Sequence, residues 1–440
     1  MVRGVIIGGM LAAGLFGQAA PDGGRYPSPV DVALSPDGHD VYVVCEGTDE
    51  VVVADRATLA IRARVRVGHV PRGIAAGRDR IYVTNSWADT VTEIDAATLR
   101  VTRTLPAGFE PIGLALDARG QILYVANRIS NDICVIDLRT GREIKRLAGG
   151  RGASYAAAAG SRVYVTHIYP NPGQFRAEPE SEITEIETEH QTVAARLRLH
   201  NVAGVFHVAL SADGRLGIAG QLRPKNLIPL AHVAHGWAFG DSLAIFGEEI
   251  GGIVQLPLDE LDRYFSLPFG VAIAPDDLRV YLTASGTNEV AVLDLKRLVT
   301  AARAPNRDAL ANDLSVSARY VMARIPVGRN PRGIALSSNG AQLFVANRLD
   351  DTVSVIDTAT NKIARTIELG GPAVVTPQRR GERLFYSSNF SFQRQFGCAN
   401  CHLDSTFDGL QWDLEPDGFG VDIVDNRAIE DVATLAGVKL

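Results

Sequence analysis

The sequence is poor in the residues on which several protein classes depend. Its 440 residues include four cysteines, three tryptophans and three methionines. Four cysteines are too few for the disulfide framework of a small secreted fold. Lysine and arginine number 44 against 50 aspartates and glutamates, a net charge of −6. Because no long basic stretch accompanies this balance, we expect no nucleic-acid partner. A hydrophobic content of 46% excludes disorder as the main state.

Long apolar runs are scarce too, and the first of them opens the chain. Arg3 precedes an apolar stretch over residues 4–16, after which Gly17 and Ala19 offer small residues at positions −3 and −1 of a cleavage point. This order is typical of a secretory signal peptide, which we place at residues 1–20. The stretch is shorter than the ~20 residues that span a bilayer, and nothing later in the chain has transmembrane character. We therefore expect a periplasmic or secreted protein with no membrane span after signal cleavage.

A repeat with a period near forty occupies most of the chain. Residues 71–108 align with residues 331–370, and related copies begin at Pro29, Pro111 and Pro268. Each copy alternates β-branched with polar residues, and Gly, Asp or Asn interrupts the alternation, which is strand periodicity. Four short strands in a repeat of this length indicate the blades of a β-propeller.

Counting the copies gives seven blades, with eight as the alternative. The copies cover 29–68, 69–108, 109–150, 151–201, 202–265, 266–329 and 330–369. A half-copy at 372–389 shows two strands, which could begin an eighth blade or lead into another domain. The fold class is therefore all-β, and we place the propeller at residues 26–390.

Three insertions interrupt the repeats. Those at 167–181 and 223–240 lie between strands two and three of their blades, so we expect both at one mouth of the ring. The third, at 296–319, lies between strands three and four, has a helical pattern, and belongs to the opposite face. Functional residues concentrate in such loops on a rigid scaffold.

The motif that carries chemistry is Cys398-Ala399-Asn400-Cys401-His402. C-x-x-C-H is the attachment sequence of c-type haem. Two thiols at this spacing reach the two vinyl groups of one porphyrin edge, and the adjacent imidazole then ligates the iron. A thioredoxin-like redox pair would need a βαβ context that the sequence lacks. A zinc site would need further ligands, and no Cys or His follows His402.

Two family resemblances agree with these patterns. The block at 82–85, Tyr-Val-Thr-Asn, with close variants at 124–127 and 344–347, resembles the YVTN-type β-propeller family. Residues 390–432 resemble the cytochrome c module that follows such propellers and is related to di-haem cytochrome c peroxidases and MauG-like proteins. This resemblance implies a small, partly helical haem module at 391–440 with one haem c. Since the chain has a single C-x-x-C-H, it does not imply a two-haem arrangement.

The haem module is short, and the sequence does not identify the second axial ligand of the iron. Only 38 residues follow His402, whereas a small haem domain needs at least ~50 to build a core. No Met or His lies among them to serve as the sixth iron ligand. Three explanations remain: a truncated chain, an iron with an open sixth position, or a ligand supplied by the propeller. For the last, we name His232 or His235, which we expect to face the same mouth as His167 and His207.

Three functions fit these features. The leading one is an exported c-type cytochrome that transfers electrons and uses the propeller as a docking scaffold. The second is a peroxidase-like or substrate-oxidising haem enzyme acting on a small molecule, and the third is a ligand-binding or protein-binding propeller with an accessory haem. Nine acidic residues against two basic ones after His402 favour a basic redox partner; the nine are Asp404, Asp408, Asp413, Glu415, Asp417, Asp422, Asp425, Glu430 and Asp431.

Overall fold

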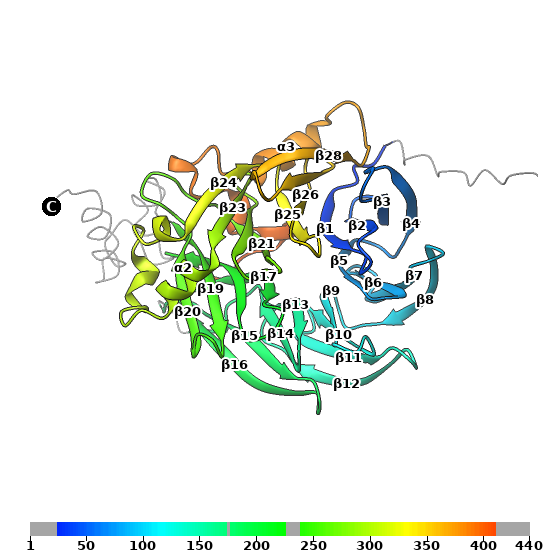
Figure 1. The fold of residues 1–440 in the computed structure, drawn as a ribbon, viewed down its shortest axis with the longest axis horizontal. Helices are drawn as coiled ribbons and strands as arrows, with labels where there is room; N and C mark the ends of the chain where they lie inside the picture. The colour runs from blue at the N-terminus through cyan, green and yellow to red at the C-terminus, as the bar shows by residue number, and fades with distance from the viewer. Residues whose placement is uncertain (1–23, 174–176, 226–237, 411–440) are drawn as a thin grey trace, which may run out of the picture.

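A computed structural model describes residues 24–173, 177–225 and 238–410 (Figure 1). In this part of the chain, seven four-stranded antiparallel sheets stand around one axis, and each sheet follows the chain order of its strands. The inner strands β1, β5, β9, β13, β17, β21 and β25 contact one another in a closed ring. The protein is a seven-bladed β-propeller, which confirms the prediction from the repeats.

The strand bounds follow the repeats closely. Blades one and two comprise β1 (Pro29–Leu34), β2 (Asp40–Cys45), β3 (Glu50–Asp55), β4 (Ile61–Arg66), β5 (Pro71–Ala76), β6 (Arg80–Asn85), β7 (Thr90–Asp95) and β8 (Arg100–Pro106). Blades three and four comprise β9 (Pro111–Leu116), β10 (Ile122–Asn127), β11 (Asp132–Asp137), β12 (Arg142–Ala148), β13 (Ala153–Ala159), β14 (Arg162–His167), β15 (Glu180–Glu187) and β16 (Thr192–His200). Blades five to seven comprise β17 (Gly204–Leu210), β18 (Gly217–Pro224), β19 (Phe239–Gly247), β20 (Gly252–Pro257), β21 (Pro268–Ile273), β22 (Arg279–Ala284), β23 (Glu289–Asp294), β24 (Val321–Pro326), β25 (Pro331–Leu336), β26 (Gln342–Asn347), β27 (Thr352–Asp357) and β28 (Lys362–Glu368).

The hydrophobic core lies between the blades. The second strand of a blade is buried on both faces, as β2 is throughout, whereas the outer strand β4 exposes alternate residues. One cluster joins Val44 of blade one to Val83 and Ile94 of blade two. Because a single blade cannot cover either of its faces, stability depends on stacking neighbours around the ring.

Glycine on the inner strands permits this stacking where neighbouring backbones come closest. A Cβ atom on Gly73 would lie 2.4 Å from the carbonyl oxygen of Ile112, and one on Gly270 would lie 2.3 Å from that of Arg332. Neither distance is compatible with a side chain at the glycine. The glycine of the Pro-x-Gly pattern is therefore required by packing.

Polar side chains close the ring between blades one and seven, because each of these blades is built from four consecutive strands and neither lends a strand to the other. Arg379 is 1% exposed and donates to Asp351 Oδ1 at 3.0 Å and to Ser28 Oγ at 2.8 Å. Its guanidinium also lies 4.0 Å from the ring centroid of Tyr26. Arg348 of blade seven forms an ion pair with Glu46 of blade one at 2.5 Å. These contacts fix the first blade to the last.

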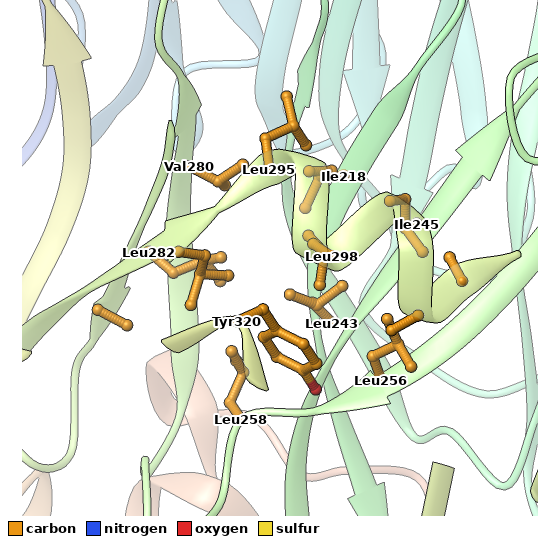
Figure 2. Packing of buried hydrophobic residues seen from close by; sticks show 14 of the residues in the cluster. Ile218, Leu243, Ile245, Leu256, Leu258, Val280, Leu282, Leu295, Leu298 and Tyr320 are labelled. Carbon is orange, nitrogen blue, oxygen red and sulfur yellow. The ribbon is translucent and has the colours of Figure 1, made fainter. Parts of the chain in front are cut away.

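The insertion in blade six is helical, as predicted. It contains α2 (Leu295–Ala302), η1 (Ala309–Asn312) and η2 (Ser317–Arg319). Asp294 caps α2 by accepting from the Arg297 amide at 2.9 Å. Figure 2 shows Leu295, Leu298 and Tyr320 packed against the strands of blades five and six.

The segment after the last blade corrects one expectation. Residues 372–389 contain the helix α3 (Pro377–Phe385) and not two strands. Thr376 caps this helix by accepting from the Arg379 amide, and Pro377 occupies the first turn, where its missing N–H costs nothing. Short turns follow at η3 (Phe392–Arg394), η4 (Cys398–Asn400) and η5 (Leu403–Ser405). Among the described residues, no helix is long and apolar enough to cross a membrane.

Candidate functional site

The segment 386–410, which we call the plug, lies across one mouth of the propeller. Ala399 and Leu403 of the plug are 1% and 5% exposed. They share one apolar cluster with Ile168, Phe239 and Leu349 from three different blades. Ile168 lies near the start of the blade-four insertion and Phe239 near the end of the blade-five insertion, so the described ends of both insertions lie at this mouth, as expected from the sequence.

The C-x-x-C-H motif forms a compact turn within the plug. Cys398 opens η4, and its carbonyl oxygen accepts from the His402 amide at 3.0 Å. Both cysteines are free thiols; Cys398 is exposed and Cys401 is half-buried. Burial, with a smaller contribution from Asp408, raises the pKa of Cys401 to about 12. Both side chains and the imidazole are thus presented from one turn of backbone.

His402 is held in an orientation that suits a metal ligand. Its ring is exposed, and Nδ1 lies 3.1 Å from the carbonyl oxygen of Thr406. A carbonyl can only accept, so this bond places the proton on Nδ1 and leaves the lone pair on Nε2. A backbone carbonyl on one ring nitrogen is the usual support of a ligating histidine.

The residue types fit a c-type haem, but only Cys398 and His402 are exposed, whereas Cys401 packs against the apolar cluster beneath the plug. The cavity beside Cys401, lined by Tyr169, Phe206 and Phe407, measures about 20 Å³, far below the ~300 Å³ of a typical cofactor site. A porphyrin therefore cannot enter between the plug and the blades. Aromatic side chains are exposed on the outer side of the same segment, namely Phe390 at 74%, Phe392 at 52% and Phe407 at 61%.

An aspartate two residues after His402 anchors the plug. The Asp404 carboxylate lies 2.9 Å from Arg332 and 3.4 Å from Arg72, both on inner strands. The side chains of Asp404 and Arg332 are 4% and 1% exposed. Asp404 has a φ of 51°, in the left-handed region that few side chains adopt. Charge pairing at the mouth supports this backbone conformation.

Further charges surround this pair. Glu46 contacts both Arg72 and Arg348, and Glu110 pairs with Arg128. The arginines together hold the pKa of Asp404 well below its usual range, although burial alone would raise it. We call this group the mouth cluster; it consists of Arg72, Arg128, Arg332, Arg348, Glu46, Glu110 and Asp404.

The histidines named from the sequence are distributed differently from the expectation. His167 is fully buried inside blade four, where Nε2 accepts from the Gly150 amide at 2.9 Å and Nδ1 lies 2.7 Å from the Glu182 carbonyl oxygen. It therefore does not face the mouth. His207 lies in the central channel. His232 and His235 lie outside the described residues.

Sequence reasoning missed the mouth cluster. The only indication was Pro-Arg-Gly, which occurs at 71–73 and again at 331–333. In a propeller, the first residues of the inner strands face the channel, so an arginine repeated there is a candidate binding residue. Asp404 carries no such indication, because its importance depends on the path of the plug.

Fold and site together define a seven-bladed propeller whose mouth is closed by a segment with a C-x-x-C-H turn. No family model matches the chain. The chain is 29% identical over 167 residues to hydrazine synthase subunit beta of Kuenenia stuttgartiensis, a match that covers 37% of this chain and 43% of the relative. A solved structure of Kuenenia stuttgartiensis hydrazine synthase superposes with a TM-score of 0.72 at 24% identity, over 80% of this chain and 99% of that one. The structural likeness establishes the shared propeller fold.

Proposed function

We propose that this protein is an exported c-type cytochrome that carries one haem on Cys398 and Cys401, with His402 as the proximal ligand. The observation that supports this most directly is the C-x-x-C-H turn itself, with two free thiols and with His402 Nδ1 bound to the Thr406 carbonyl. When bound, the haem would supply one-electron redox chemistry. The signal peptide inferred at residues 1–20 supports a location in the periplasm, where such haems are attached.

In this proposal the chain's own residues position the haem attachment site. Thr406 sets the tautomer of His402, and the buried pair of Asp404 with Arg332 holds the motif over the propeller mouth. The ring then serves as a rigid docking scaffold for a redox partner. Rigid support of a site limits reorganisation, because its side chains are locked by packing and hydrogen bonds.

The match to hydrazine synthase subunit beta supports a second, related candidate, in which the chain is one subunit of an oxidoreductase complex. Such a chain would have partner subunits, and its haem would belong to an enzyme acting on a small molecule. The spin state of the haem iron distinguishes the two candidate functions. A six-coordinate low-spin iron favours electron transfer, and a five-coordinate high-spin iron with peroxide turnover favours catalysis.

The test is expression of the full chain in a host with periplasmic haem attachment, followed by a pyridine haemochrome assay. We expect one haem per chain in the wild type and loss of covalent haem in Cys398→Ala and Cys401→Ala. Cys134→Ala is the matched control, because Cys134 is a buried free cysteine in blade three. The same low haem content in wild type and both plug variants would refute the proposal.

A further inference from the structure

A small cavity lies in the central channel, and the inner strand of each blade contributes one lining residue. Four of the seven side chains are polar, namely Arg72, Tyr155, His207 and Arg332. The other three are apolar. The cavity measures about 10 Å³, which is about the smallest volume that holds one water-sized occupant. It lies next to the Asp404 carboxylate, since Arg72 and Arg332 contact both.

Arg332 and Arg72 donate to Asp404, but three other donor groups of the lining have no acceptor. Among the described residues, neither the Tyr155 hydroxyl nor the His207 ring has a hydrogen-bond partner, and the two ring centroids lie 4.3 Å apart with the ring planes tilted by 40°. The Nε of Arg72 is buried and has no partner either. Arginine can only donate. Burial, together with Arg332, lowers the pKa of His207 to about 4, so a neutral ring with one N–H faces the cavity.

The charge around the cavity is also unbalanced. The mouth cluster contains four arginines but only three carboxylates, even with Asp404 in place. One positive charge is therefore left over in a buried region. A buried charge without a counter-charge is costly, and so is a buried donor without an acceptor, such as Arg72 Nε.

We propose that this channel cavity is a binding site for one small monovalent inorganic anion of about halide size, held by Arg72, Arg332, Tyr155 and His207. An anion accepts from all four donors and balances the surplus charge. A cation would meet two guanidinium groups, and a water molecule would leave the charge unbalanced. The apolar walls, which include Phe269, limit the size of the ion.

Bromide identifies the occupant directly. Crystals of the full-length protein grown in sodium bromide should give an anomalous difference peak in the cavity, within about 3.5 Å of an arginine nitrogen. Density without anomalous signal in the cavity means that water fills it, and the proposal then fails. This measurement uses the wild type, so it does not depend on how any variant folds.

Thermal unfolding provides the second test. At constant ionic strength, replacing gluconate by chloride should raise the unfolding midpoint saturably, by about 2 °C at ten times the dissociation constant. Tyr155→Phe and His207→Phe remove a donor but keep the ring, and should reduce this rise. Tyr124→Phe is the matched control, because its buried hydroxyl lies in β10 of blade three. An equal rise in all three variants would overturn the assignment.

Discussion

Replacing Asp404 by asparagine tests whether one buried ion pair holds the plug on the propeller. The substitution keeps the side-chain size but removes the charge opposite Arg332, whose side chain is 1% exposed. Breaking a buried pair in this way costs about 3–5 kcal/mol, because the remaining charge has no partner. Detachment of the plug lets water reach Arg332, so the loss should be local to residues 386–410 and the blades should remain folded.

Limited proteolysis of the full chain measures this loss. If cleavage follows the open population, 3–5 kcal/mol corresponds to cleavage in the plug that is roughly 150-fold to 4,000-fold faster. Asp350→Asn is the control: Asp350 pairs with Arg383 of α3 at 3.2 Å and with Arg329 at 2.8 Å, but these side chains are 23%, 25% and 54% exposed. Such a pair contributes at most about 1 kcal/mol. Cleavage of the Asp404 variant within about twofold of the control would refute the reasoning.

The same pair predicts an acid dependence. Because the arginines lower the folded-state pKa of Asp404, its stabilising effect is complete above the ordinary aspartate pKa of about 4. It is lost as the pH falls below that value, when the carboxylate is protonated more easily in the detached plug. Proteolysis of the wild type should therefore accelerate below about pH 4, and the Asp404→Asn variant should lack this component.

Three further predictions concern the ring. Arg379→Ala leaves Asp351 buried and unpaired, so urea unfolding should show a loss of about 3–5 kcal/mol, whereas the exposed neighbour Arg380→Ala should change little. Equal effects would contradict the role of Arg379 in fixing the first blade to the last. Gly270→Ala should destabilise the protein, because the new Cβ would lie 2.3 Å from a backbone oxygen. Gly381→Ala in α3 should instead stabilise it by about 0.5–1 kcal/mol, because a Cβ there meets nothing within 4 Å. Thermal unfolding shifts of the same sign for both variants would refute the packing argument. Burial, together with Arg332, lowers the pKa of His207 from 6.5 to about 4. In buffer free of small anions, stability should therefore fall as the pH drops from 6.5 towards 4, by about 3 kcal/mol in denaturant titrations, and His207→Phe should be less acid-sensitive.

The blades could be predicted because their determinants are local. The alternation of residues such as those in β6 (Arg80–Asn85) fixes which face is buried, and the repeat supplies the same strand order seven times. The helical insertion at 296–319 was also predictable, because its apolar spacing has a helical period. Residues 372–389 misled the prediction: Val-Val and Phe-Tyr suggested strands, but the Thr376–Pro377 start and a run of polar residues specify a helix.

The site was predictable only as far as its chemistry lies within one short motif. Cys398, Cys401 and His402 are recognised by their spacing alone. The partners of Asp404 are more than seventy residues away in Arg332 and more than three hundred away in Arg72. Such pairings arise from the closure of the ring and the path of the plug, and a single sequence contains no pattern that specifies either.

Peptide mass analysis after thiol alkylation tests the central claim most directly. The full-length protein, purified from a host that attaches periplasmic haem, is alkylated and digested. The account predicts that the peptide with Cys398 and Cys401 carries the added mass of one iron porphyrin and takes up no alkylating reagent. Recovery of that peptide with both thiols alkylated and no porphyrin mass would contradict the account.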